Sequence, residues 1–347
     1  MKNILFTYFP LYVGYNYGIS LLTSLCKQNS IDAMYVPCGK SFMDVVDSYD
    51  IIGFSFVTDE DYKQCLPYLM YAKSLGKEIL AGGVYARRGG KIDRKLVDHI
   101  CRGEADVEEG GLVDYLLNDD RTVFELRMVR ESIDGLPSPD MTGIKGTEFS
   151  RGWNFLQGIK MWPYQSSRGC WYGKCTFCEI QNLPECKKVR IKHTIWEDLT
   201  KIIDTVKPNL LYLFDELPPY NMEEWREQWL DIRIPFLSYI RADITQEDLL
   251  WMINHGLKVA SFGIECGDEI YRNNVLLKGV SNADIIRTVS LLRKNNVFYI
   301  PTYMVGLPGE TPSEVECTKK VIENVGGFPL VFTYHNLRDT MEEGYEF

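Results

Sequence analysis

The stretch SSRGCWYGKCTFC, residues 166–178, decides how this chain is interpreted. It carries Cys170, Cys175 and Cys178 in a C-x4-C-x2-C arrangement. Three thiolates this close in sequence can converge on one metal centre. A strand is expected at 163–167, where the stretch begins. We therefore expect the cysteines on a loop at the carboxyl end of a strand, where α/β barrels carry their chemistry.

Two kinds of metal centre agree with this spacing. A 4Fe–4S cluster held by three cysteines leaves one iron open for the amine and carboxylate of a substrate. Structural zinc takes four closed ligands, and Cys186 is an available fourth. A zinc staple more usually pairs two C-x2-C knuckles, and this stretch contains one. The spacing therefore favours iron–sulfur and leaves zinc as the alternative.

The composition is that of an ordinary globular protein. The chain has 347 residues, enough for two domains, with 45% hydrophobic and 25% charged residues. No window holds about 18 consecutive apolar residues, so no membrane span is expected. The N-terminal stretch MKNILFTYFP is typical of a buried first strand rather than a signal peptide, which predicts a cytoplasmic protein.

The charge and the cysteines exclude further classes. A net charge of −10 argues against nucleic acid as a partner. The one basic run, at 187–193, is interpreted as a solvated face. Disulfides are not expected in a long chain that clusters three of its ten cysteines. Six others are interpreted as packed thiols: Cys26, Cys38, Cys65, Cys101, Cys266 and Cys317.

Residues 1–120 alternate short apolar runs with helical stretches. Strands are expected at 3–9, 32–37, 50–57, 78–84 and 98–103, and helices at 17–29, 60–76, 92–98 and 109–118. Near-continuous apolar strands that alternate with helices indicate a parallel sheet covered on both faces. Right-handed crossovers then give a doubly wound, Rossmann-like domain.

A second alternation occupies residues 161–335, after a proline-bearing linker at 121–160. Strands are expected at 163–167, 209–214, 236–241, 258–264, 297–304 and 329–334, and helices at 194–206, 222–229, 245–255, 282–295 and 311–324. Eight β/α units need about 250 residues, and about 185 remain. The expected fold is an open, partial (β/α)6 barrel, followed by a tail at 336–347.

The cysteine stretch resembles the cluster loop of the radical S-adenosylmethionine (radical SAM) enzymes. Their usual spacing is C-x3-C-x2-C, so this loop carries one extra residue between Cys170 and Cys175. Arg168-Gly169 and Phe177 also fit the family. The resemblance implies a 4Fe–4S cluster on the three cysteines and S-adenosylmethionine as its ligand.

The resemblance continues along the ends of the later strands. It implies that Phe177 contacts the adenine, that Asp215 and Glu216 accept from the methionine amine, that Arg241 ends the third strand of the site, that Glu265 accepts from the ribose hydroxyls, and that Gly306 and Pro308 border the nucleoside. Taken singly, each has a plainer interpretation. Asp215 and Arg241 could simply pair with each other, and Gly-Leu-Pro-Gly is a competent turn.

The first domain resembles the cobalamin-binding domain that precedes the radical domain in one large subfamily. The matching pieces are 51–55, 81–86 and 101–106, and the cobalamin tail would lie near Gly82, Gly83 and Gly103. Alternatively, these glycines only shape tight turns. The cobalt-ligating motif Asp-x-His-x-x-Gly is replaced at 10–15 by a stretch without histidine. Cobalamin is therefore an open third cofactor.

These observations lead to one principal hypothesis and two rivals. The principal hypothesis is an enzyme that cleaves S-adenosylmethionine reductively to a 5′-deoxyadenosyl radical. With cobalamin it would be a C-methyltransferase, and without it rearrangement, epimerisation or cross-linking is expected. Its partners would be a small-molecule or peptide substrate and an electron donor such as flavodoxin or ferredoxin. The rivals are a non-catalytic, substrate-presenting subunit and a zinc-stapled binding protein.

Overall fold

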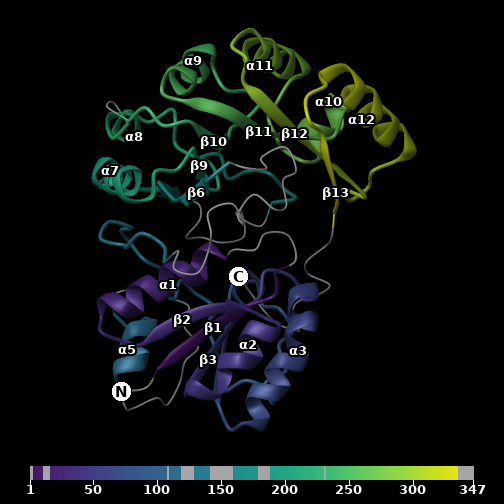
Figure 1. Cartoon of the computed structure of the whole chain (residues 1–347). Coiled ribbons are helices and arrows are strands. Elements are labelled where there is room, and N and C mark those ends of the chain that lie inside the picture. Colours follow the sequence, from purple (N-terminus) through teal and green to yellow (C-terminus); the bar gives the residue numbers. More distant parts are fainter. Residues whose placement is uncertain are drawn as a thin grey trace. The chain divides into compact units, whose positions relative to one another are not determined.

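The computed structural model contains two compact units, which we call unit 1 and unit 2 (Figure 1). Unit 1 comprises Met1–Glu131, Gly135–Gly158 and Asn336–Phe347, and unit 2 comprises Ser132–Asp134 and Ile159–His335. The structure describes residues 3–10, 16–107, 109–118, 129–140, 159–178, 188–229 and 232–334. Most of the predicted linker, the whole predicted tail and Cys186 therefore lie outside the described residues.

Unit 1 is built on a five-stranded parallel sheet in the order β2-β1-β3-β4-β5. Its strands are β1 (Ile4–Tyr8), β2 (Ala33–Pro37), β3 (Ile51–Ser55), β4 (Glu78–Gly82) and β5 (His99–Ile100). The strand order reverses between β1 and β3. Ligands of doubly wound sheets bind at this reversal, outside the carboxyl ends of the strands. The predicted Rossmann-like fold is confirmed.

Alternate strand residues build a separate core on each face of this sheet. Leu5 of β1 packs in one buried cluster with Leu69, whereas its neighbours Ile4 and Phe6 pack in another with Ile19. Figure 1 shows α1 and α5 on one side of the sheet, and α2 and α3 on the other. The helices are α1 (Tyr17–Gln28), α2 (Lys40–Val45), α3 (Asp59–Ser74), α4 (Val84–Arg87) and α5 (Leu112–Leu117).

One predicted element of unit 1 is wrong. No helix forms at 92–98, and the short helix α4 precedes that segment instead. The buried residues Ile92 and Val97 are five positions apart, a spacing that does not place them on one helix face. The backbone N–H of Asp93 donates to the Tyr62 hydroxyl (2.9 Å), and its carboxylate accepts from the N–H of Lys95 (2.9 Å). Local turns therefore replace the helix.

Unit 2 contains a six-stranded parallel sheet in the order β13-β12-β11-β10-β9-β6. Its strands are β6 (Met161–Tyr164), β9 (Leu210–Leu213), β10 (Phe236–Tyr239), β11 (Leu257–Glu265), β12 (Phe298–Val305) and β13 (Leu330–Thr333). Because β6 and β13 lie at opposite edges, the sheet does not close. The predicted partial barrel of six β/α units is confirmed.

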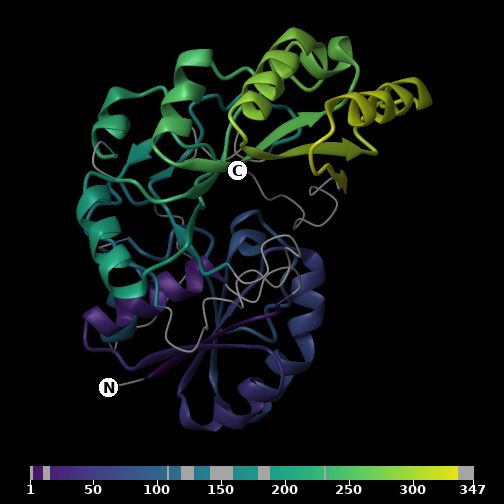
Figure 2. The ribbon, with the colours of Figure 1, turned by 45° about the horizontal axis from the view of Figure 1, so that its top comes forward.

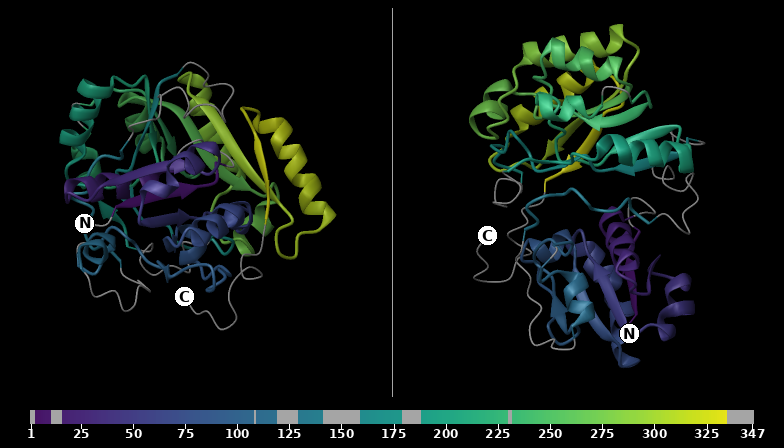
Figure 3. Two further views of the ribbon diagram at one scale, coloured as in Figure 1. Left: turned by 60° about the horizontal axis from the view of Figure 1, so that its bottom comes forward. Right: turned by 90° about the vertical axis from the view of Figure 1, so that its left-hand side faces the viewer.

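The helices of unit 2 cover the outer face of the curled sheet (Figures 2 and 3). They are α7 (Ile195–Val206), α8 (Glu223–Glu227), α9 (Gln246–Asn254), α10 (Glu269–Asn274), α11 (Asn282–Lys294) and α12 (Pro312–Val325). α11 shows why they form. Ser281 and Asp284 make a reciprocal capping box at its start, and Ile285, Val289 and Leu292 bury one stripe of the helix.

A small antiparallel pair accompanies the large sheet and carries the basic run of the sequence. β7 (Ser167–Arg168) pairs with β8 (Arg190–Ile191). Arg190 and Lys192 are buried, and Lys192 pairs with Asp198. The interpretation of this run as a solvated face is therefore wrong for these two residues, because the pairing of β8 with β7 carries them inward.

No described helix has the length and hydropathy that crossing a bilayer requires.

Candidate functional site

The loop that carries the three cysteines follows β6. Its first residues are held by the buried carboxylate of Asp215, which follows β9. One oxygen of Asp215 accepts from the backbone N–H groups of Ser166 (2.7 Å) and Ser167 (2.9 Å), and the other bonds to the Ser166 hydroxyl. The indole N–H of Trp225 donates to the same hydroxyl at 2.9 Å. Burial raises the pKa of Asp215 to about 7. Asp215 thus fixes the start of the loop, and both its oxygens are engaged.

Glu216, the next residue, presents an exposed carboxylate to the same loop. It accepts from the backbone N–H of Gly169 at 3.1 Å. Gly169 has a φ of 95°, in the left-handed region that favours glycine. Of the two carboxylates, Glu216 is therefore the one available to a ligand, and its partner Gly169 directly precedes Cys170.

The middle of the loop is held by an aromatic ring. The guanidinium of Arg241, at the end of β10, lies 3.5 Å from the centre of the Tyr172 ring. The Tyr172 hydroxyl donates to the carbonyl of Leu277 at 2.6 Å. Gly279 has a φ of 67°, and a Cβ there would lie 2.4 Å from the Tyr172 hydroxyl oxygen. Only glycine therefore leaves room for the ring in this position.

The end of the loop is tied to the segment that follows α10. The backbone N–H of Thr176 donates to the carbonyl of Leu276 at 3.0 Å, and its hydroxyl donates to the carbonyl of Val275 at 2.8 Å. Within the loop, the N–H of Cys178 donates to the carbonyl of Cys175 at 3.0 Å. The 275–279 segment thus clamps the cysteine loop at Tyr172 and at Thr176.

Lys278, in that clamp, joins several predicted site residues. Its buried ammonium lies 2.8 Å from a carboxylate oxygen of Glu265 and 5.5 Å from the centre of the Phe177 ring. Burial raises the pKa of the Cys175 thiol, while the positive charges of Lys278 and Arg241 act in the opposite direction. The ammonium of Lys278 therefore interacts both with the cysteine loop, at Phe177, and with the end of β11, at Glu265.

Glu265 reaches this position through an unusual backbone. Its φ is 67°, rare for a residue other than glycine, and the pairing of β11 with β12 shifts register between Gly263 and Glu265. A Cβ on Gly263 would lie 1.8 Å from a carboxylate oxygen of Glu265. The bulge and the glycine together turn the carboxylate toward Lys278.

The turn after β12 borders the same cluster of side chains. Gly306 donates its backbone N–H to Glu310 at 2.7 Å, and its φ of 78° favours glycine. The hydroxyl of Tyr271 donates to the carbonyl of Pro308 at 2.8 Å. Between these residues, Leu307 is buried in a cluster against which Phe177 packs. The turn is thereby anchored next to the aromatic ring of the cysteine loop.

The donor chemistry of the loop fits an iron–sulfur cluster. Cys170, Cys175 and Cys178 are half-buried thiols, and no described cysteine forms a disulfide. Within the described ranges, no three His, Cys, Asp or Glu side chains are arranged to hold a single metal ion. In a cluster each cysteine binds a different iron, so the thiolates need not meet at one point.

Three buried polar atoms in and around the loop have no hydrogen-bond partner among the described residues. They are the hydroxyl oxygen of Ser167, the indole nitrogen of Trp171 and one carboxylate oxygen of Glu310. Native proteins rarely leave such atoms unsatisfied. A bound polar ligand would supply what they lack.

The predicted residues therefore form a connected set at the carboxyl edge of the sheet. Contacts link Glu216 to the start of the loop, Arg241 to its middle, and Phe177 and Glu265 through Lys278. The suggested pairing of Asp215 with Arg241 is wrong, because Arg241 forms a two-point ion pair with Asp243 (2.8 and 2.9 Å). Asp215 lies beneath the loop rather than at its surface.

The glycines of unit 1 lie at or beyond the carboxyl ends of β4 and β5, as predicted. A Cβ on Gly83 would lie 2.5 Å from the carbonyl oxygen of Phe56, and its φ is 87°. Gly83 is thus required by the chain's own packing. A Cβ on Gly82 would make ordinary contact with Cys101, and the Gly103 carbonyl accepts from the Cys101 thiol at 3.7 Å. These contacts support the interpretation of Gly83 as a turn residue.

Sequence reasoning missed the residues that hold the site together. The sequence predicted no role for Lys278 or Gly279. Tyr172 and Ser166 gave no signal, because their partners are 105 and 49 residues away in the chain. Such long-range contacts can be identified only when the arrangement of the strands in the sheet is known.

Comparison with protein families identifies the part of the chain that carries this geometry. Residues 164–322 match the model of the Radical SAM superfamily. This part of the chain is a radical SAM domain. It contains the cysteine loop, Glu216, Arg241, the Glu265–Lys278 pair and the Gly306 turn. The match confirms the resemblance to radical SAM enzymes that the sequence predicts. Domains of this superfamily use a 4Fe–4S cluster and S-adenosylmethionine.

Solved structures extend the likeness beyond the radical SAM domain. The methyltransferase TsrM from Kitasatospora setae, bound to tryptophan and an S-adenosylmethionine analogue, has a TM-score of 0.72 at 12% identity, with 96% of this chain and 73% of TsrM covered. OxsB, bound to aqua-cobalamin, has a TM-score of 0.68 at 16% identity. That match covers 93% of this chain and about half (52%) of OxsB. At these identities the likeness shows the fold. No curated protein sequence matches the chain.

Proposed function

We propose that the chain is a radical SAM enzyme in which Cys170, Cys175 and Cys178 hold the 4Fe–4S cluster. The observation that carries the proposal is the clamped loop, in which the Cys175 thiol experiences the charges of Lys278, Arg241 and Glu265. A zinc staple would not call for a buried ammonium beside a cysteine, nor for unsatisfied polar atoms in the loop.

S-adenosylmethionine would lie along the carboxyl edge of the unit 2 sheet. Glu216 is the proposed acceptor for the methionine ammonium, because its carboxylate is exposed and both oxygens of Asp215 are engaged. Phe177 would contact the adenine, and Glu265 would accept from the ribose while retaining its pair with Lys278. Gly306 and Pro308 would border the nucleoside.

When held by the three cysteines, a reduced 4Fe–4S cluster would supply the electron for reductive cleavage of S-adenosylmethionine to methionine and a 5′-deoxyadenosyl radical. The chain's own groups orient the ligand for that step. Arg241 and the 275–279 segment fix the cysteine loop, and Lys278 balances the charge of a thiolate at Cys175. The substrate class (a small molecule or a peptide) and an electron donor such as flavodoxin or ferredoxin are part of the proposal.

Cobalamin-dependent methyl transfer is the second candidate, favoured by the fold of the whole chain. TsrM and OxsB, whose structures contain cobalamin, share that fold over more than nine-tenths of this chain. We place the cofactor at the carboxyl edge of the unit 1 sheet, near Gly82, Gly83 and Gly103. The packing of the chain itself explains the contacts of Gly83, so the support for cobalamin comes from the fold.

The test is anaerobic reconstitution with iron and sulfide, followed by dithionite and S-adenosylmethionine. We expect a brown protein that releases 5′-deoxyadenosine. Cys175→Ala should lose the cluster and the product, and the matched control Cys317→Ala, in α12, should keep both. Hydroxocobalamin that co-elutes with the protein would support methyl transfer. A protein that retains its cluster and yields neither 5′-deoxyadenosine nor S-adenosylhomocysteine, even with candidate substrates, would favour the non-catalytic alternative.

A further inference from the structure

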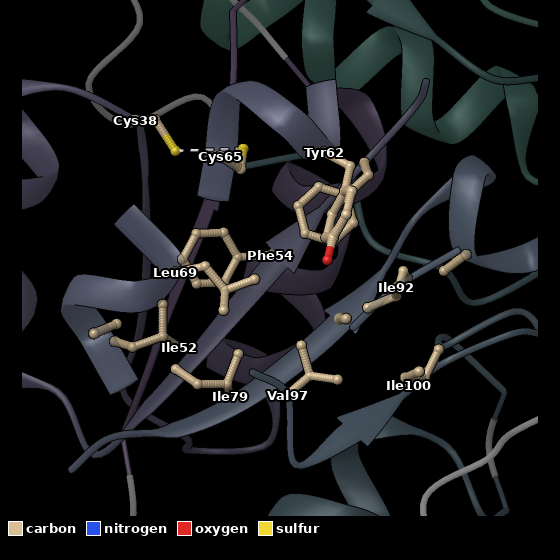
Figure 4. Packing of buried hydrophobic residues seen from close by; sticks show 14 of the residues in the cluster. Cys38, Ile52, Phe54, Tyr62, Cys65, Leu69, Ile79, Ile92, Val97 and Ile100 are labelled. Atoms are coloured by element: carbon tan, nitrogen blue, oxygen red, sulfur yellow. Dashed lines mark hydrogen bonds between the residues drawn. The ribbon is translucent and has the colours of Figure 1, made fainter. Parts of the chain in front are cut away.

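Two thiols meet inside unit 1, far along the chain from the cysteine loop. Cys38 follows β2, and Cys65 lies in α3. Their sulfur atoms are 3.7 Å apart, as the dashed line in Figure 4 shows. The Thr7 hydroxyl lies 3.4 Å from the sulfur of Cys38 on its other side. The three side chains therefore form a short polar chain across an otherwise apolar core.

The surroundings hold this pair in place. Both cysteines belong to the buried cluster that also contains Phe54 and Leu69 (Figure 4). The backbone N–H of Cys38 donates to the carbonyl of Tyr8 at 2.8 Å, which continues the pairing of β2 with β1 by one residue. Each thiol is fixed by a different element, so their contact follows from the fold rather than from neighbourhood in sequence.

The two thiols are not equivalent. Cys38 retains 9% of its surface, whereas Cys65 is fully buried. Hydrogen bonds from Cys65 and Thr7 lower the pKa of Cys38, while the bond to Cys38 and burial raise the pKa of Cys65. Thiols that react with oxidants are the more acidic and accessible ones, and they commonly stand beside a resolving cysteine. Cys38 is the less buried of the two and has the lowered pKa, and Cys65 lies next to it as a resolving cysteine would.

We propose that Cys38 and Cys65 are a redox pair that a hydroperoxide converts into an intrachain disulfide. The Cys38 thiolate attacks one oxygen of hydrogen peroxide, the O–O bond breaks, and Cys38 becomes a sulfenic acid while the other oxygen leaves as water. The Cys65 sulfur then displaces the sulfenic oxygen, which leaves as a second water with the Cys65 proton. Two thiols are oxidised by two electrons, and one peroxide is reduced to two waters.

The new bond would join the end of β2 to the middle of α3. It would close a loop between residues 27 positions apart, at the carboxyl edge of the unit 1 sheet. Cross-links of this kind restrict the unfolded chain and so stabilise the unit that contains them. The proposal does not depend on the cluster or on the proposed function.

The experiment uses the full chain, purified anaerobically and treated with one to a few equivalents of hydrogen peroxide. Remaining thiols are blocked with N-ethylmaleimide in denaturant, and the protein is digested with trypsin without reductant. Trypsin places the two cysteines in separate peptides, 28–40 and 64–73. We expect the linked peptide pair by mass spectrometry in most of the protein, and its disappearance on reduction.

Single variants separate the two roles. Cys65→Ser should leave a sulfenic acid on Cys38 that dimedone traps, whereas Cys38→Ser should leave Cys65 as an unmodified thiol. Cys101→Ser removes another buried cysteine of unit 1 and should leave the link intact. The proposal is overturned if wild-type Cys38 and Cys65 both carry N-ethylmaleimide after peroxide. It is equally overturned if Cys38 is linked mainly to a cysteine other than Cys65. The wild-type result decides the question even if a variant folds poorly.

Discussion

The guanidinium of Arg241 lies 3.5 Å from the centre of the Tyr172 ring. Arg241 ends a strand of the sheet, and Tyr172 stands midway between the first two cysteines of the loop. Through this contact, a residue that follows a strand of the sheet holds a loop that contains little regular structure. Asp243 and the carbonyl of Lys278 also accept hydrogen bonds from this guanidinium (2.7–2.9 Å). The position of Tyr172 in the loop therefore depends on Arg241, whose guanidinium is oriented by Asp243 and by the carbonyl of Lys278.

Gly279→Ala should displace Tyr172 and reduce cluster assembly. The added Cβ would meet the Tyr172 hydroxyl oxygen at 2.4 Å, in a backbone conformation that costs alanine about 1 kcal/mol or more. We expect iron content after reconstitution to fall several-fold. Gly76→Ala is the matched control, because its φ is 72° and no atom lies within 4 Å of the added Cβ. Equal iron content in the two variants would contradict the clamp.

Lys278→Met should destabilise unit 2 by about 3 kcal/mol, since it leaves the buried carboxylate of Glu265 without its cation. Urea unfolding followed by tryptophan fluorescence measures the change. The double variant Lys278→Met/Glu265→Gln should recover part of the loss, because the unpaired charge is then removed as well. A double variant whose loss equals the sum of the two single losses would show that the pair contributes nothing as a pair.

Asp215→Asn should remove a pH dependence of stability. Burial raises the pKa of Asp215 to about 7 in the folded protein, against about 3.9 in an unfolded chain. Between these values the folded protein holds a proton that the unfolded chain releases. The free energy of unfolding therefore falls as the pH rises toward 7, by up to about 1.4 kcal/mol per pH unit. Chemical unfolding from pH 5 to pH 8 should show this slope in the wild type and a smaller one in the variant. Parallel curves would refute the assignment.

His193 should titrate above its ordinary range. Hydrogen bonds to Asp134 (2.8 Å) and Glu224 (2.5 Å) raise the pKa of the imidazole. The stabilisation is present below the unfolded pKa and is lost as the pH rises through the folded one. NMR titration of the ring protons measures this directly, and the chain has only four histidines. Glu224→Gln should lower the pKa of His193, while Glu223→Gln, its neighbour on α8, should leave it nearly unchanged.

Periodicity predicted the strands and helices of unit 2 to within one or two residues at most ends. The reason is physical, because most strands there are largely apolar and several long helices begin at a recognisable cap such as Ser281 or Thr311. Short elements escaped. The two-residue strands β7 and β8 have no period of their own, and they form because Asp215 and Lys192 hold Ser166 from both sides.

The site was predicted where its residues belong to strand ends, and missed where one residue acts through another. Cys170 is conspicuous because three cysteines lie within nine residues, whereas Glu265 was assigned through the family resemblance. The family resemblance implies that Asp215 accepts from the methionine amine of S-adenosylmethionine. In the structure, both carboxylate oxygens of Asp215 accept hydrogen bonds from Ser166, which lies 49 residues earlier in the chain. No local pattern records such a partner.

The clamp has a consequence for the order of events on the ribosome. The cysteine loop follows the first strand of its sheet, whereas the Leu277 carbonyl that holds Tyr172 is made 105 residues later. At 5–20 residues per second, the interval is roughly 5 to 20 seconds. During that time Tyr172 and Thr176 lack the carbonyl partners that hold them in the folded protein. Metal insertion into a defined site therefore belongs after translation of β11 and α10, and a nascent chain arrested before Leu277 would present its cysteines as a loose, exchangeable chelator.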